Sequence, residues 1–265
     1  MTHVDLYDGH YGHLSADAQV EVRRETYGED LGQSSWMTAG EARHWFDLLR
    51  LGRGQRALEV ACGSGGATRE MAHHTGATCV GVDLNAHGIE AAQARAAGDG
   101  GAPSVSYQTV DAGGRLPFPD ASFDAVFCND AINHLPDRAT VLQEWHRLLR
   151  PGGRVLFTDP IVVTGQLTSV EMRSRSSIGF YLFIPLGLNE RLLEQAGFTV
   201  REVRDVTDAV ASISRKWCDA RARRRERLVP LEGLDGFEGL QRFLEVTHTL
   251  ASERRLSRFM YLADK

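Results

Sequence analysis

The sequence predicts an α/β protein built on a doubly wound, mostly parallel sheet with a helical lid. From residue 56 to residue 159, short apolar runs alternate with amphipathic stretches. Runs such as ALEVAC and TCVGVDL lack the polar alternation of a half-exposed strand, which indicates strands buried on both faces. Buried strands that alternate with helices are typical of a parallel sheet covered by helices on both sides.

The expected elements follow one another along the chain. Helical periodicity around residues 16–26 and 39–49 predicts an N-terminal helical cap over residues 1–50. A core over residues 51–206 comes next. Its predicted strands are residues 57–62, 78–84, 105–111, 123–130, 153–159 and 198–206, and its predicted helices are residues 67–74, 86–97, 137–150 and 188–197. Residues 160–187 are mixed in pattern and are expected to be loop-like.

A mostly helical segment interrupts the sheet before its last strand. Two helices, at about residues 208–228 and 236–255, precede the alternating terminal segment SRFMYLADK at residues 257–265. This segment is expected to be the final strand of the core. The helical stretch is too long for a tight connection between neighbouring strands. We therefore predict a lid insertion over residues 207–256 that covers the ligand-binding edge of the sheet.

Composition narrows the class of function. The chain has 265 residues, 42% hydrophobic and 25% charged, as in an ordinary globular protein. The net charge of −5 argues against a dedicated nucleic-acid binder, and the arginines of RARRRER at residues 221–227 are expected on a solvated lid face. We see no signal peptide and no membrane-length apolar run, so we expect a cytoplasmic protein without a membrane partner. The N-terminal and lid helices could supply the interface of a homo-oligomer.

The cysteines and histidines form no metal-binding pattern. The four cysteines are widely spaced, with no CxxC motif. The segments HYGH and His73-His74 lack a carboxylate or cysteine partner at ligand spacing. We therefore predict no metal site.

The most informative stretch is ALEVACGSGG, residues 57–66. A buried strand runs into Gly63-Ser64-Gly65-Gly66, and a helix begins near Ala67. Glycines at such a turn let the backbone bend sharply and let a ligand approach the main chain. In open α/β sheets, ligands bind outside the carboxyl ends of the strands. The stretch predicts a cofactor site but does not identify the cofactor.

Neighbouring acids narrow the choice of cofactor. Asp83 ends the second predicted strand, where a carboxylate can accept both hydroxyls of a ribose, and Asp111 ends the third, placed for the amino group of an adenine. No register starting at residue 61 or 63 gives the G-x-G-x-x-G of dinucleotide-binding proteins. The chain also lacks the Gly-Lys-Ser/Thr of a P-loop, so an NTPase is not supported.

The ordered blocks resemble the class I S-adenosylmethionine-dependent methyltransferases that act on small molecules. EVACGSG resembles their first motif, an acidic residue followed by xGxGxG, and VGVDL resembles the second. VDAGGRLPFPDASFDAVFCNDAINHLPD resembles the third and fourth, and LLRPGGRVLFTD the turn and strand that follow. The blocks keep the family's order and spacing across residues 56–159. Ala61 departs from the family's first glycine, and we expect a mild effect because Gly63 and Gly65 are kept.

The resemblance implies a seven-stranded sheet whose last strand is antiparallel, with S-adenosylmethionine as cofactor. Glu59 and the glycines would line its methionine part, Asp83 would bind the ribose, and Asp111 with Ala112 would hold the adenine. The main-chain carbonyl of Asn129 would accept from the adenine amino group. The complete set of expected cofactor-binding residues is Glu59, Ala61, Gly63, Gly65, Asp83, Leu84, Asp111, Ala112, Asn129 and Tyr11.

Methyl transfer from a sulfonium is an in-line displacement in which proximity supplies much of the acceleration. A base is needed only when the acceptor must lose a proton. His134, after the fourth core strand, titrates near neutrality when unperturbed and is the candidate base, with Asp159 as the carboxylate that orients or assists it. Both match positions in similar sugar O-methyltransferases of antibiotic pathways. The alternatives are that His134 packs under its loop or contacts cofactor, and that proximity alone suffices.

Acceptor-binding candidates lie in two segments. Related enzymes close an N-terminal helix and loop over cofactor and substrate, and the apolar run at residues 180–184 could line a hydrophobic acceptor pocket. The candidates are Tyr7, Gln33, Trp36, Asn133, Phe180 and Phe183. Ordinary packing or capping is the competing explanation for each of them.

These observations favour methyl transfer to an oxygen, nitrogen or carbon atom of a small-molecule acceptor in secondary metabolism. One alternative is a methyltransferase for RNA or protein. Against it, the chain has no appended basic module, and Asn129-Asp130-Ala131-Ile132 is not the Asn-Pro-Pro-Tyr type of signature. The other alternative is a nucleotide-binding Rossmann-like protein that does not transfer methyl groups.

Overall fold

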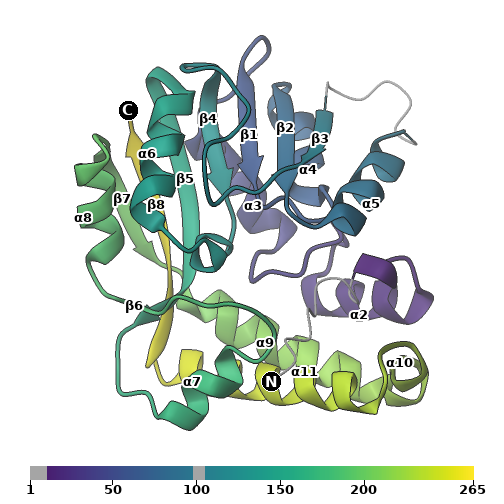
Figure 1. Ribbon diagram of the computed structural model, residues 1–265. Helices are drawn as coiled ribbons and strands as arrows, with labels where there is room; N and C mark the ends of the chain where they lie inside the picture. The colour runs from purple at the N-terminus through teal and green to yellow at the C-terminus, as the bar shows by residue number, and fades with distance from the viewer. Residues whose placement is uncertain (1–10, 98–104) are drawn as a thin grey trace.

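The computed structural model describes residues 11–97 and 105–265 (Figure 1). Within these residues, eight strands form one sheet in the order β3-β2-β1-β4-β5-β8-β7, and the short β6 pairs with β5. The strands are β1 Arg56–Val60, β2 Thr78–Asp83, β3 Val105–Thr109, β4 Phe123–Cys128, β5 Leu149–Val163, β6 Ile184–Pro185, β7 Thr199–Asp205 and β8 Leu256–Asp264. Strands β1 to β5 are parallel, whereas β8 is antiparallel to both β5 and β7. The predicted fold class is therefore confirmed, with β6 as a small addition.

Helices bury both faces of this sheet, as the apolar strands predicted. Leu58 of β1 lies in a cluster with Trp145 of α6 and Leu193 of α8, whereas its neighbour Ala57 lies in a second cluster with Trp45 of α3. Adjacent residues of a strand point to opposite faces, so each strand contributes to both clusters. The helices are α2 Asp17–Tyr27, α3 Ala39–Leu48, α4 Gly66–Thr75, α5 Ala86–Ala97, α6 Arg138–Leu148, α7 Ser169–Arg175, α8 Leu188–Gln195, α9 Thr207–Arg223, α10 Arg225–Glu232 and α11 Leu234–Ser252.

The helices α9, α10 and α11 form a separate layer together with α2 and α7, seen at the base of Figure 1. This layer has its own apolar core, in which Val22 of α2 and Trp217 of α9 join Phe243 of α11. The predicted N-terminal cap is thus divided: α2 packs with the predicted lid, whereas α3 packs against α4 and the sheet.

The basic run at residues 221–227 faces carboxylates within this layer. Arg221 is buried and pairs with Glu232 at 2.7 Å, and Arg227 pairs with Glu21 of α2 at 2.8 Å. Arg224 also reaches Glu21, at 3.0 Å. These charges join α2 to α9 and α10, so the run contributes to packing of the lid layer as well as to its surface.

Three features differ from the sequence-based expectation. Residues 160–187, expected to be loop-like, contain α7, which begins in a capping box between Thr168 and Glu171. Strand β5 continues past residue 159 because its last residues, Val162 and Val163, pair with β8. Pro230, expected between two helices, lies inside α10. No helix in the described part of the chain is long and apolar enough to cross a membrane.

Candidate active site

A cavity of about 1090 Å³ opens at the carboxyl ends of the parallel strands. Its wall comes from the turns that follow β1, β2, β3 and β4, and from the loop between α2 and α3. Ligand pockets for small molecules commonly have volumes of roughly 300–1,000 Å³, so this cavity has room for a nucleoside-sized cofactor and part of an acceptor. The predicted site residues that line it are Tyr11, Gln33, Glu59, Ala61, Gly63, Asp83, Leu84, Asp111, Ala112, Asn129, His134 and Phe180.

The turn after β1 is held in a left-handed backbone conformation at three positions. Ala61, Gly63 and Gly65 have φ angles of 57°, 54° and 72°. The amide of Gly63 donates to Asp83 Oδ2 at 2.7 Å, which ties the turn to the end of β2. An L-residue in this region costs roughly 1–2 kcal/mol, so the alanine at position 61 carries backbone strain. The effect of this departure from the family motif is therefore larger than a mild change of side chain.

Gly63 and Gly65 serve different purposes. Gly63 lines the cavity beside Tyr11, and a Cβ atom at this position would lie 2.4 Å from the Tyr11 hydroxyl. Gly65, predicted to bind cofactor, is not among the lining residues. A Cβ atom there would lie 2.5 Å from Tyr107 and 2.6 Å from Ala92. Gly65 therefore permits close packing of the turn against α5 and β3.

The three acids of the cofactor half have different environments. Glu59 is buried and accepts a hydrogen bond from the Thr68 hydroxyl. Burial, and next the nearby charge of Asp83, raise its pKa to about 8 against the lowering effect of that hydrogen bond. Asp83 accepts from the amides of Gly63 and Asn85, one at each carboxylate oxygen, and Asp111 accepts from an amide at 2.8 Å. A carboxylate has about four acceptor positions, so both aspartates can bind ligand hydroxyl or amino groups as well.

His134 also lines this cavity, at the end of the short 3₁₀ helix η1 (Ile132–His134). Its Nδ1 is 2.6 Å from the carbonyl oxygen of Phe180, and its ring packs edge-on against Tyr181. A carbonyl can only accept, so Nδ1 carries the proton and Nε2 is the ring nitrogen that can accept one. Burial, with a contribution from the charge of Arg175, lowers the pKa of His134 to about 4. The imidazole is therefore neutral at physiological pH.

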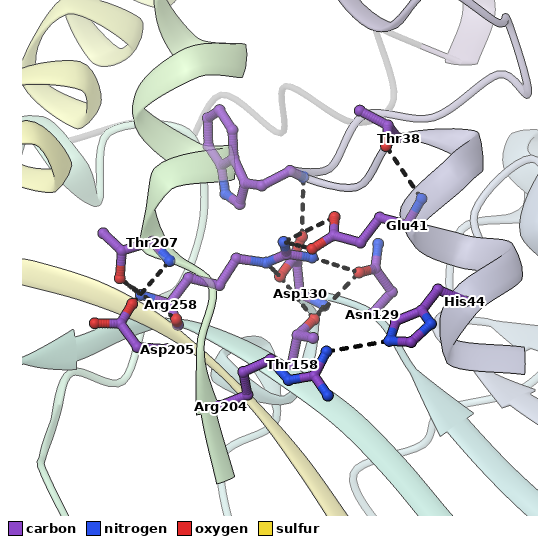
Figure 2. A network of polar contacts seen from close by, with 11 residues as sticks. Thr38, Glu41, His44, Asn129, Asp130, Thr158, Arg204, Asp205, Thr207 and Arg258 are labelled. Atoms are coloured by element: carbon purple, nitrogen blue, oxygen red, sulfur yellow. Dashed lines mark hydrogen bonds and ion pairs between the residues drawn. The ribbon is translucent and has the colours of Figure 1, made fainter. Parts of the chain in front are cut away.

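Asp130, which is not among the predicted site residues, lines the cavity and belongs to a network of polar contacts (Figure 2). One carboxylate oxygen accepts from the Trp36 amide at 2.9 Å, and the other accepts from Arg258 Nε and the Thr158 hydroxyl, both at 2.7 Å. Arg258 is fully buried and also donates to Glu41, at 3.1 Å and 3.2 Å. This network connects the end of β4 to β8 and α3.

Two sequence signals point to this network. Asp130 directly follows Asn129 at the end of the fourth strand, an edge where polar residues gather. Arg258 shares one face of β8 with Met260 and Leu262, both of which are buried. A charged residue on an inward-facing period-two row indicates an ion pair in the core.

The remaining predicted residues lie elsewhere. Asp159 is fully buried, pairs with Arg138 at 2.5 Å and lines neither cavity. Its charge still acts on His134 and tends to raise the pKa of the imidazole. Asn133 is also fully buried and lines neither cavity. Phe183 packs with the apolar cluster around Ile161 instead of facing the cavity. Tyr7 lies outside the described residues.

Trp36 lies at a second, smaller cavity, which His134 also lines. It is buried, stacks on Phe243 of α11 at 6.3 Å and meets Trp217 of α9 edge-on. It lines a cavity of about 30 Å³ that shares Asp130 and His134 with the large one. The two predicted candidates Trp36 and His134 therefore lie around one space, between the sheet and the lid layer.

Comparison with known proteins identifies the family. A family model described as a methyltransferase domain matches residues 58–157. O-methyltransferase rstn1 from Aspergillus nomiae is 34% identical over 205 residues, which cover 77% of this chain and 84% of that protein. The chain belongs to the class I S-adenosylmethionine-dependent methyltransferases.

Two further matches extend over nearly the whole methyltransferase. O-methyltransferase resE from Aspergillus sclerotiorum is 29% identical over 266 residues, covering 98% of this chain and 95% of that protein. The solved structure of the cyclopropane synthase MmaA2 from Mycobacterium tuberculosis superimposes with a TM-score of 0.85 at 16% identity, covering 99% and 98% of the two chains. The last likeness concerns the fold alone. The predicted family, enzyme class and cofactor are confirmed.

The described residues fit S-adenosylmethionine. The cavity is large enough, the turn after β1 exposes backbone beside it, and Asp83 and Asp111 have acceptor capacity at its rim. Buried Glu59 adds a carboxyl group that can respond to a cationic ligand. Among the described residues, no group of three or more histidine, cysteine or acidic side chains is arranged to hold a metal ion.

Proposed function

We propose that this methyltransferase transfers a methyl group to a hydroxyl oxygen of a small-molecule acceptor, with His134 as the general base. The observation that carries the proposal is a neutral imidazole at the wall shared by both cavities, whose Nδ1 is held by the Phe180 carbonyl. That tautomer directs the basic Nε2 away from the carbonyl. Two relatives, resE and rstn1, are named O-methyltransferases, which supports oxygen over nitrogen or carbon.

The cofactor half of the cavity is assigned from its lining residues. Ala61 and Gly63 would contact the methionine part, Asp83 the ribose hydroxyls, and Asp111 with Ala112 the adenine. S-adenosylmethionine supplies an activated methyl group on a sulfonium sulfur. The protein's task is then to hold the acceptor oxygen in line with the carbon–sulfur bond, which can account for about 7–11 kcal/mol of the barrier.

The role of His134 is to receive the proton that the acceptor loses. As the acceptor oxygen bonds to the methyl carbon, the carbon–sulfur bond breaks and its electron pair stays on sulfur. The hydroxyl proton moves to Nε2 of His134 and passes from there to solvent. Because burial lowers the pKa of this imidazole to about 4, it needs no prior deprotonation at neutral pH. General-base catalysis of this kind contributes typically about 10²–10⁴-fold.

A small acceptor is favoured by the enclosure of this space. The lid layer places Trp217, Leu240 and Phe243 around the smaller cavity, so the group of an acceptor that enters it is surrounded by side chains. The basic run at residues 221–227, the feature that would suggest RNA, has ion pairs to Glu21, Glu25 and Glu232. Both observations support a small molecule over RNA or protein.

The test compares His134→Gln with His146→Gln. A glutamine at 134 can still donate to the Phe180 carbonyl but cannot act as a base at neutral pH. His146 lies on α6, packs against Phe198 and does not line the cavity, so its variant is the matched control. We expect kcat to fall about 10²–10⁴-fold in His134→Gln only, with S-adenosylhomocysteine binding retained. A wild-type kcat and pH profile in His134→Gln would rule out the base.

A further inference from the structure

Arg175, at the end of α7, is a buried cation without a carboxylate partner in the described part of the chain. Its exposed fraction is 1%, and neither Nε nor Nη1 has a hydrogen-bond partner. The contacts of its guanidinium are aromatic: Tyr181 at 4.9 Å, Phe243 at 4.8 Å and Trp36 at 5.8 Å from the ring centroids. Ring faces attract the charge but do not satisfy the two N–H groups.

The other buried arginines show that this arrangement is unusual within the molecule. Each of them pairs with a carboxylate at 3.1 Å or less: Arg23 with Asp30, Arg138 with Asp159, Arg221 with Glu232, and Arg258 with Asp130 and Glu41. Removing a charge from water without a partner is strongly unfavourable. A ligand that brings an oxyanion would offset that penalty at Arg175.

Arg175 lines the cavity of about 30 Å³ together with His134 and Asp130. That cavity shares Ser34, Ser35, Asp130 and His134 with the large one, so the two are adjacent. A molecule that placed an oxyanion on Arg175 would therefore extend toward His134. The Asp130 carboxylate lies in the same space and is paired with Arg258, 2.7 Å away, a cation that it shares with Glu41.

The small volume of the cavity at Arg175 limits which oxyanions can bind there. A water needs about 10–15 Å³ of such volume, so a space of about 30 Å³ admits a group of very few atoms. The planar fork of a guanidinium also matches the two oxygens of a carboxylate. Both considerations favour a carboxylate over the larger, tetrahedral phosphate.

We propose that Arg175 binds a carboxylate of the acceptor, so that the substrates of this enzyme are small hydroxy acids. Arg175 holds the carboxylate among the rings of Trp36, Tyr181 and Phe243, and the hydroxyl of the same molecule lies at His134. The inference rests on the proposed function for the identity of the methylated group. The recognition of the carboxylate itself is independent of catalysis.

The test uses the complex with S-adenosylhomocysteine and pairs of probes that differ in charge but little in shape. These are para-hydroxybenzoate with para-hydroxybenzamide, and lactate with lactamide, titrated by calorimetry, with inorganic phosphate as a third arm. We expect the acid of at least one pair to bind at least tenfold more tightly than its amide. In Arg175→Met this preference should disappear. Equal binding of acid and amide in both pairs, or binding of phosphate alone, would overturn the carboxylate assignment.

Two variants separate a binding role from a structural one. Arg173→Met removes an exposed arginine of the same helix and should keep the preference for the acid. Arg175→Met should be at least as stable as the wild type without ligand, since it removes an uncompensated charge from the interior. A lower Tm with unchanged acid preference would show that Arg175 only supports the fold. Loss of acid binding in Arg175→Met alongside normal turnover in His134→Gln would refute the base and keep the carboxylate site.

Discussion

Replacing Arg258 with methionine should strongly destabilise the protein. The side chain is fully buried, donates to Asp130 through Nε and to Glu41 through Nη1, and lies over the Trp45 ring at 4.9 Å. Methionine keeps much of the volume but leaves two carboxylates in the interior without a cation. Breaking a buried pair in this way costs about 3–5 kcal/mol, a large part of a typical total of about 5–15 kcal/mol.

Urea denaturation of Arg258→Met provides the measurement. The loss should be largest at neutral pH and shrink in acid, because burial already raises the pKa of Glu41 and removal of Arg258 takes away the charge that opposes this rise. Protonation of the carboxylates at low pH then removes the uncompensated charge. Adding Asp130→Asn to Arg258→Met should recover part of the loss. A loss below about 1 kcal/mol at neutral pH, or one independent of pH, would refute this reasoning.

Three further predictions concern the cofactor half of the cavity. Ala61→Gly should raise the free energy of unfolding by up to about 1 kcal/mol in thermal melts, because relief of strain exceeds the entropy that glycine adds to the unfolded chain; a clear loss would contradict the strain. S-adenosylmethionine affinity, measured by calorimetry, should increase as pH rises toward about 8, because the cation favours ionised Glu59, and Glu59→Gln should remove this dependence; a flat profile in the wild type would count against it. Gly65→Ala should cost about 2–4 kcal/mol in urea, since its Cβ would overlap Tyr107; a fully stable variant would show that the turn can relax.

The sheet and the cofactor edge could be predicted because their signals are local. A strand buried on both faces is mostly apolar, and residues 57–60 and 123–128 are apolar except at Glu59 and Asp124. The Gly-rich turn could be predicted because the backbone must bend sharply between the first strand and the helix that follows it. Asp83 could be predicted because it ends the second strand, at the same edge of the sheet. The helix α7 also had a local signal, Thr168 followed three residues later by Glu171, although the mixed pattern of residues 160–187 concealed it.

The contacts around His134, where the acceptor is expected to bind, could not be predicted in the same way. The side chains there pair with residues that are far away in the sequence. Asp159 was expected beside His134, but Arg138 and Asn189 bind its carboxylate from α6 and α8. Asp130 pairs with Arg258 at a separation of 128 residues. Such long-range pairs depend on how the lid layer and the last strand pack on the sheet. A short segment of sequence does not specify that packing.

The proposed reaction is tested most directly by following the methyl group itself. The purified protein is incubated with S-adenosylmethionine carrying an isotope-labelled methyl group and a panel of small hydroxy acids and matched amines. Nuclear magnetic resonance then identifies the atom that receives the label. We predict label on a hydroxyl oxygen, with S-adenosylhomocysteine formed in equal amount. At saturating S-adenosylmethionine, where the pH dependence of cofactor affinity does not limit turnover, the rate should fall only as pH drops toward about 4, the pKa of His134. Label on nitrogen or carbon alone, or a rate that titrates near the ordinary histidine pKa of about 6.5, would contradict it.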